Sequence, residues 1–186
     1  MDELDAKIMF SVARGDLTAF GEVVERYQKP LINFVSKYTG DRSAAEDIAQ
    51  EVFLRVFKAA GDYTPKARFK TWLFKIAANY CLNEIRRSKS RPRFIAPFDL
   101  NEAGFIAIAP DSCDPGKALD TKEIGCAVRS AIANLPEKQR IAVLLQRYNG
   151  FSYQEISRIL GCSVPAVESL IQRARQSLKK QLIPYL

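Results

Sequence analysis

The chain has 186 residues, of which 47% are hydrophobic, and a formal net charge of +7. These values fit one ordinary domain or two small ones, and they exclude a disordered chain. Apolar runs of at most five residues exclude a membrane-spanning helix, and the lack of any histidine excludes histidine triads and histidine–metal sites.

The N-terminal residues, MDELDAKIMF, are acidic and begin a helical pattern, unlike the basic start of a signal peptide. A longer helix is expected after Asp16, which is suited to an N-cap, and it should end at Gly40. Apolar residues recur between these two positions in steps of three and four. Pro30 lies inside this helix and should bend it or split it.

A second helix is expected to start near Asp41 or Ser43, with apolar residues along one stripe. Its opposite face carries polar side chains, namely Glu46, Asp47, Gln50 and Glu51. Residues 61–65 then break the chain, and a third helix should run from Phe69 to Arg87. The basic end of this third helix suits a helix C-terminus and also a phosphate group.

Residues 96–121 contain prolines, glycines, one basic residue and five acidic residues, which predicts an acidic linker. Helical spacing resumes afterwards, in segments near 124–135, 137–148, 152–160 and 163–182. We therefore expect an all-α protein with two lobes, residues 1–95 and 122–186, joined by a flexible linker.

The last two helical segments have the layout of a helix-turn-helix. Ser152 and Glu155 form a capping box, Gly161 ends the first helix, and Ser163 caps the second. The exposed N-terminal half of the second helix would enter a major groove. The candidate contacts there are Ser163, Pro165, Ala166, Glu168, Ser169, Gln172, Arg173 and Arg175. An αα-hairpin that only packs a core would show the same pattern.

Basic residues gather between Arg55 and Arg93, where 11 of them face only Asp62 and Glu84. A polyanion is a natural partner for such a stripe, because each neutralised phosphate releases counterions. A solvated basic face is the alternative. The four cysteines form no CxxC pair, so neither a zinc site nor any other metal or cofactor is expected.

Three motifs together resemble the extracytoplasmic-function group of bacterial sigma factors. Residues 41–53, DRSAAEDIAQEVF, resemble the segment by which that family docks on polymerase, and 69–77, FKTWLFKIA, resemble its promoter-melting helix. The C-terminal residues LP, SYQEI, LGCS, VES and RAR, between 135 and 175, resemble its promoter-reading domain. The resemblance covers roughly residues 5–93 and 122–182.

The resemblance implies an initiation factor, not an enzyme, located in the cytoplasm and not in the membrane. Its implied partners are core RNA polymerase (the clamp helices of the largest subunit, and the flap), promoter DNA and an anti-sigma factor, in a stress or envelope response. Residues 1–95 would dock on polymerase and open the −10 element, while residues 122–186 would read the −35 element.

The same resemblance assigns roles to two sets of residues. The acidic face would repel DNA, so Glu46, Asp47, Gln50 and Glu51 are the candidate polymerase contacts; a solvated helix face is the alternative. Capture of a single strand needs aromatic faces beside positive charge. The −10 candidates are Tyr63, Lys66, Arg68, Phe69, Lys70, Trp72, Lys75, Asn79, Asn83, Arg86 and Arg87.

Three positions leave questions open, one in the N-terminal lobe and two in the helix expected to read DNA. Trp72 is the only tryptophan, and on an apolar helix it fits a core position as well as a stacking platform. Glu168 and Leu170 stand where many family members have arginines, the residues that most often contact guanine. The −35 sequence therefore stays unpredicted.

Two other functions are alternatives to a sigma factor, namely an ordinary helix-turn-helix regulator and a helical adaptor. An ordinary helix-turn-helix regulator usually binds as a dimer, and the sequence shows no evident dimerisation helix. A helical adaptor that binds only proteins would lack the steep salt dependence that phosphate contacts give.

Overall fold

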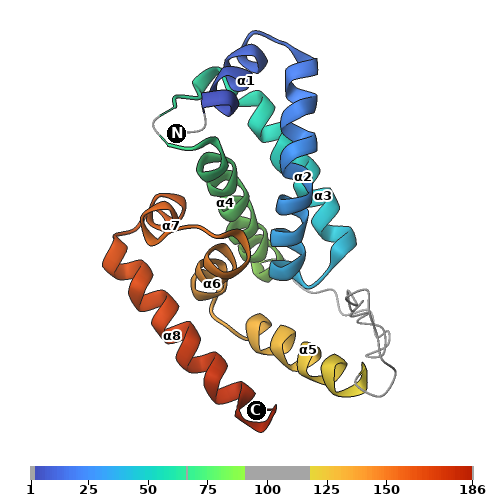
Figure 1. Cartoon of the computed structure of the whole chain (residues 1–186), viewed down its shortest axis with the longest axis vertical. Coiled ribbons are helices and arrows are strands. Elements are labelled where there is room, and N and C mark those ends of the chain that lie inside the picture. Colours follow the sequence, from blue (N-terminus) through green and yellow to red (C-terminus); the bar gives the residue numbers. More distant parts are fainter. Residues whose placement is uncertain (1–2, 66, 91–117, 186) are drawn as a thin grey trace.

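The computed structural model describes residues 3–65, 67–90 and 118–185, and all regular structure in these ranges is helical (Figure 1). The N-terminal lobe consists of α1 (Glu3–Ala13), α2 (Leu17–Thr39), α3 (Arg42–Lys58), the 3₁₀ turn η1 (Ala60–Asp62) and α4 (Phe69–Ser90). The C-terminal lobe consists of α5 (Ala118–Ala133), α6 (Glu137–Asn149), α7 (Tyr153–Leu160), α8 (Val164–Leu182) and the 3₁₀ turn η2 (Ile183–Tyr185). The all-α, two-lobe prediction is confirmed, and no helix in the described ranges has the length and apolarity to cross a membrane.

The ends of α2 follow the sequence prediction. The carboxylate of Asp16 accepts hydrogen bonds from the main-chain N–H groups of Thr18 and Ala19, at 2.9 and 3.0 Å. Gly40 ends the helix with a φ of 81°, a left-handed conformation that glycine adopts without strain. Of the two outcomes expected at Pro30, a bend or a split, the split does not occur: α2 is continuous over 23 residues. The buried side chains along its length outweigh the one backbone hydrogen bond that proline removes.

A buried carboxylate fixes α1 against α2. Asp5 is only 1% exposed, and its carboxylate accepts a hydrogen bond from the Tyr27 hydroxyl and forms an ion pair with Arg26. A carboxylate buried without such partners would be strongly destabilising. These contacts therefore determine where α1 lies along α2.

Aromatic rings connect α2 to α4 in the centre of the N-terminal lobe. Tyr27 meets Phe69 with ring centroids 5.2 Å apart, and Phe34 meets Phe74 at 5.4 Å, both edge to face. Edge-to-face contacts of this kind stabilise a core beyond the area that they bury. They hold α4 in a fixed orientation, with one side against α2.

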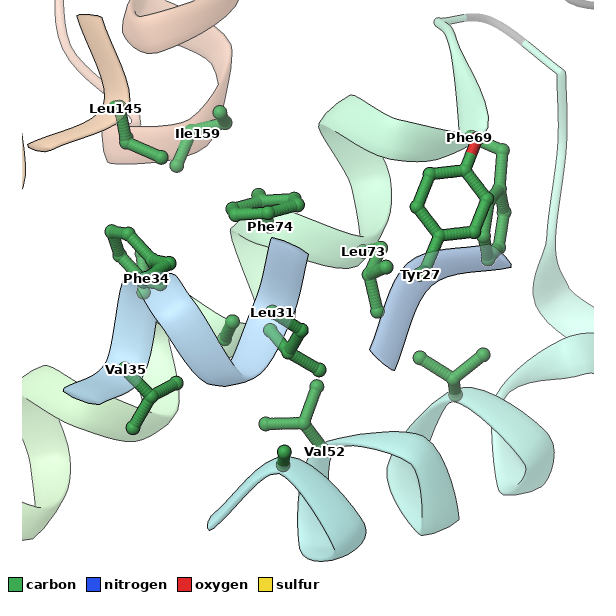
Figure 2. Close-up of a cluster of buried hydrophobic side chains, with 14 of the residues drawn as sticks. Tyr27, Leu31, Phe34, Val35, Val52, Phe69, Leu73, Phe74, Leu145 and Ile159 are labelled. Atoms are coloured by element: carbon green, nitrogen blue, oxygen red, sulfur yellow. The ribbon is translucent and has the colours of Figure 1, made fainter. Parts of the chain in front are cut away.

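The two lobes share one hydrophobic core. Figure 2 shows Leu145 and Ile159, from α6 and α7, on the side of α4 that carries Phe74. The ring of Phe151, between α6 and α7, lies 5.1 Å from the ring of Phe74. The described structure is therefore a closed arrangement, in which the C-terminal lobe packs on α4 and α2.

One boundary differs from the prediction. Helix α5 begins at Ala118, so residues 118–121 are helical, although they were expected to belong to the linker. The proline and glycine signals that suggested a linker end at Gly116, just before this helix. The rest of the expected linker, residues 96–117, lies outside the described residues.

Candidate nucleic-acid interface

The predicted capping box is present at the start of α7. The Ser152 hydroxyl accepts a hydrogen bond from the Glu155 main-chain N–H at 3.3 Å, and the Ser152 N–H donates to the Glu155 carboxylate at 2.9 Å. Burial opposes ionisation of Glu155, but the Ser152 hydrogen bonds, Arg68 and Lys70 outweigh it and lower the pKa of Glu155. This carboxylate is therefore charged at neutral pH and fixes the first turn of α7.

The turn between α7 and α8 has helix-turn-helix geometry. Gly161 adopts a φ of 63°, and the Ser163 hydroxyl accepts a hydrogen bond from the Ala166 N–H at 3.4 Å. The shared core of the two helices consists of buried aliphatic residues, namely Ile156, Ile159, Val167 and Ile171. Because these side chains face inward, the opposite side of α8 faces solvent.

The N-terminal half of α8 exposes the residues expected to read DNA. Ser163, Pro165, Glu168, Ser169, Gln172, Arg173 and Arg175 are exposed, and Ala166 is half-buried. The Arg175 guanidinium donates to the Gln146 side-chain oxygen at 3.3 Å, which ties it to α6. The helix thus presents short polar side chains first and cations later, an order suited to base edges followed by phosphates.

Five of the predicted −10 residues lie along one side of α4 or directly before its first residue. Arg68, Lys75, Asn79 and Asn83 are exposed, and Trp72 is half-buried. They follow one another in steps of three and four, so they form a single stripe along the helix. Hereafter these five residues are called the α4 stripe. It combines cations, amides and one aromatic edge on a surface that solvent reaches.

Two of the predicted aromatics do not present open faces. Tyr63 and Phe69 are 5% and 1% exposed. Their ring centroids lie 6.0 Å apart. The ring centroid of Trp72 lies 5.1 Å from that of Tyr63 and 5.9 Å from that of Phe69. The expectation that they stack on bases does not fit this structure, because hydrophobic burial uses their surfaces. Instead they support Trp72, which is half-buried and is the most exposed of the three residues.

Lys70 is turned away from the α4 stripe. Its ammonium donates to the main-chain carbonyl of Asn149 at 2.7 Å and lies 4.7 Å from the ring centroid of Phe151. Burial lowers the pKa of Lys70, which Glu155 partly offsets. In this arrangement the C-terminal lobe occupies Lys70, so it is not free to bind a phosphate.

Three other candidates cannot be placed. Lys66 lies outside the described residues. Arg86 and Arg87 belong to the last turns of α4, but the structure describes only their backbone.

The predicted acidic face lies on the solvent side of α3. Glu46, Asp47 and Gln50 are exposed and Glu51 is half-buried. Arginines of the same helix pair with two of these carboxylates, Arg42 with Glu46 at 3.4 Å and Arg55 with Glu51 at 2.8 Å. Exposed pairs of this kind contribute little to stability, so they leave the face available to a partner.

Sequence reasoning missed two exposed apolar residues. Leu54 is 52% exposed and lies one turn after Gln50 on the acidic face. The sequence could have indicated this exposure, because Leu54 does not lie on the side of α3 that carries the buried residues. Phe10 is 49% exposed on α1, and its ring lies 6.5 Å from that of Tyr63. No local sequence pattern predicts that Phe10 contacts Tyr63, because the two residues are far apart in the sequence.

The comparisons with known families cover both lobes. The sequence model of Sigma-70 region 2 matches residues 23–91, and that of Sigma-70 region 4 matches residues 127–178. The first match contains α3 and the α4 stripe, and the second contains the helix-turn-helix.

Relatives match along nearly the whole chain. The chain is 33% identical to the RNA polymerase sigma-H factor of Pseudomonas aeruginosa, covering 99% of this chain and 96% of that protein. It is 31% identical to the ECF RNA polymerase sigma factor SigW of Bacillus subtilis, covering 98% of each. A solved structure of CnrH in complex with the cytosolic domain of CnrY superposes with a TM-score of 0.70 at 25% identity, covering 97% of this chain and 98% of CnrH.

Proposed function

Because this chain belongs to the extracytoplasmic-function group of bacterial RNA polymerase sigma factors, we propose that it acts as a stoichiometric, non-catalytic initiation factor in the cytoplasm. It binds core polymerase through α3, opens the −10 element along α4 and reads the −35 element with α8. In this proposal none of its residues carries out a chemical step. The observation that carries this proposal is the pair of exposed polar faces, the α4 stripe and the N-terminal half of α8.

The α4 stripe suits the capture of an opened strand. Trp72 offers an aromatic edge held by Tyr63 and Phe69, and Lys75 supplies positive charge one turn away. Stacking on an aromatic face and a positive groove are the two features by which proteins hold single strands. Asn79 adds an amide that can hydrogen-bond a base edge.

The outer face of α3 suits a basic protein surface. Asp47 and Gln50 are exposed, and Leu54 places an apolar side chain beside them. An apolar centre with a charged rim is the common anatomy of a protein interface. The carboxylates repel DNA, so we assign this face to the clamp helices of polymerase.

We assign the regulatory partner, an anti-sigma factor acting in a stress or envelope response, to the groove between the end of α2 and α5. This groove holds about 360 Å³ and is lined by the apolar Val128, Ile132 and Tyr148 and by the cations Lys37 and Arg129. Apolar walls with two cations favour an amphipathic, acidic segment. The structural relative CnrH was itself solved with the cytosolic domain of CnrY.

Co-elution with core polymerase tests the proposal. The parent chain should co-elute in size-exclusion chromatography with core polymerase from a related bacterium, whereas the variant E46K, D47K, E51K should not. The control is the variant E22K, E25K, E123K, which makes the same charge change at other exposed positions and should still co-elute. A parent chain that does not bind core polymerase contradicts the proposal.

A further inference from the structure

Helix α1 presents an exposed aromatic ring between two exposed cations. Lys7, Phe10 and Arg14 are all exposed, and Phe10 is 49% exposed. They follow one another in steps of three and four, so they lie on one side of α1 and of the turn directly after it. The opposite side of the helix carries the buried Met9 and Val12. Hereafter Lys7, Phe10 and Arg14 are called the α1 stripe.

The two cations of the α1 stripe are available to a partner. Neither Lys7 nor Arg14 forms an ion pair with a side chain that the structure describes. Asp5 belongs to the same helix, but it is buried and its charge is matched by the ion pair with Arg26. Cations exposed in this way attract a polyanion, because each phosphate that they neutralise releases counterions.

The α1 stripe adjoins the ring cluster that supports Trp72. The Phe10 ring centroid lies 6.5 Å from that of Tyr63, whose own centroid lies 5.1 Å from that of Trp72. The rings of Phe10 and Trp72 are therefore at most about 12 Å apart, and the buried Tyr63 contacts both. Figure 1 shows α1 beside the segment that joins α3 to α4, where η1 contacts it. Two rings that solvent reaches, one from each helix, thus share one buried support.

This spacing suits a single strand of nucleic acid. Stacked nucleotides rise about 3.4 Å each, so about four of them span the distance between the two rings. Proteins hold single strands by stacking bases on aromatic faces beside positive charge, and every base has such a face. The exposed Asp62, next to Tyr63 in the sequence, makes the intervening loop less attractive to phosphates. On this side of Tyr63 the positive charge comes from Lys7 and Arg14.

We propose that the α1 stripe is a further single-strand binding site, which stacks a base on Phe10 and holds the flanking phosphates with Lys7 and Arg14. This inference rests on the proposed function, because the ligand is the strand that the α4 stripe captures. The model of Sigma-70 region 2 matches residues 23–91, so α1 lies outside the segment to which that match applies.

The test uses the full chain and single-stranded DNA, without polymerase. The probe is a fluorescein-labelled strand of random sequence and about 12 nucleotides, within the site sizes of small strand-binding domains. Fluorescence anisotropy measures its dissociation constant between about 50 and 200 mM salt. The structure exposes both stripes, so the free chain should bind the probe. A parent chain that does not bind it overturns the inference.

The aromatic variants separate stacking from packing. F10A removes the ring, whereas F10L keeps a large apolar side chain without an aromatic face. Both should bind the probe at least about fivefold more weakly than the parent, the lower limit for one lost stacked base. The control Y185A removes a ring that is 48% exposed in η2, and it should bind like the parent. F10L with parental affinity overturns the inference, because Phe10 then only packs. Thermal melting followed by circular dichroism checks that each variant is folded.

The charge variant K7A, R14A tests the phosphate contacts. It should reduce the slope of log affinity against log salt by about 1.4, the change for two phosphate contacts on a single strand. F10A should keep the parental slope, because the ring carries no charge. The control K138A, R147A removes the same two residue types at exposed positions of α6. An unchanged slope in K7A, R14A, or an equal reduction in the control, overturns the role of the two cations.

The fluorescence of Trp72 distinguishes this inference from the proposed function. Trp72 is the only tryptophan, so its quenching reports a strand beside the α4 stripe. Saturating probe should quench Trp72 equally in the parent and in F10A. Quenching with unchanged affinity in F10A overturns the site on α1 and leaves the α4 stripe in place. Loss of quenching in F10A also overturns it, because Phe10 then only positions Tyr63.

Co-elution with core polymerase provides a second, independent readout. The α1 stripe shares no residue with the acidic face of α3, so F10A should co-elute like the parent. If F10A does not co-elute but binds the probe like the parent, α1 contacts protein and the inference is overturned. If the parent binds the probe but not core polymerase, the proposed function fails and the strand site on α1 does not.

Discussion

Lys70 and Asn149 lie 79 positions apart in the sequence, yet the Lys70 ammonium donates a 2.7 Å hydrogen bond to the Asn149 carbonyl. Five residues further along α4, Lys75 faces solvent. One helix therefore divides its cations between two roles, contact with the other lobe and contact with a partner. The helical period produces this division, because positions five apart lie on different sides of the helix.

Arg173→Ala is expected to weaken binding to all −35 sequences about equally. Arg173 is exposed beyond the first turns of α8, where side chains reach phosphates. Loss of one phosphate contact lowers the slope of log Kd against log salt by about 0.9. Fluorescence anisotropy of holoenzyme on labelled promoters measures this slope. The control is Lys138→Ala, on exposed α6 surface; a similar fall in its slope would remove the special role of Arg173.

Asn79→Ala is expected to impair promoter opening without weakening the binding of core polymerase. Its amide lies in the α4 stripe, and loss of a base contact costs about 1.4 kcal/mol, or about tenfold in open complex. Permanganate reactivity of unpaired thymines measures opening directly. Gln176→Ala, at an exposed position near the middle of α8, serves as the amide control. Equal loss of core binding would show that Asn79 acts on the fold instead.

Glu155→Gln is expected to destabilise the protein in a pH-dependent way. The folded-state pKa of Glu155 is lowered, so the charged form contributes stability above the unfolded pKa of about 4.3. That contribution is lost as pH falls through the folded pKa. The variant should lose about 1 kcal/mol at pH 7 and progressively less in acid. Urea unfolding at pH 7 and near pH 3 measures the difference, and a pH-independent loss contradicts this account.

Cys81 is expected to resist alkylation in the folded protein. Burial raises the pKa of Cys81 to about 12, which leaves about one thiolate in ten thousand at pH 8. Cys126 is exposed and should react with iodoacetamide well before Cys81 does. Peptide mass spectrometry distinguishes the two sites, and urea should make Cys81 reactive. Equal labelling of both in the native protein would show that α4 opens readily around Cys81.

Helix ends and turns were the most predictable features. Asp16, Gly40, Ser152 and Gly161 each act on backbone groups within a few residues, so the sequence around them contains the whole interaction. The helix-turn-helix was predictable for the same reason. Its capping box and turn glycine are local signals, and the short helices leave few ways to bury the residues between them.

The status of individual −10 residues was not predictable, because long-range packing decides it. Tyr63 and Phe69 have the composition of a stacking site, but contacts with α1 and α2 bury them. Helical spacing places Lys70 and Lys75 on different sides of α4, but only the position of α6 determines that Lys70 is the one in contact with the C-terminal lobe. Spacing along one helix shows which residues share a face, but not what that face meets.

The contact between Phe74 and Phe151 also bears on how long the protein survives in a cell. Because both lobes draw on one core, closing them protects the apolar surface of each, and the free chain should melt in one cooperative step. Separation of the lobes would expose these rings, and each lobe alone would be small and marginally stable. Proteases digest such states first. The shared core would therefore slow proteolysis of the chain for as long as the lobes stay packed together.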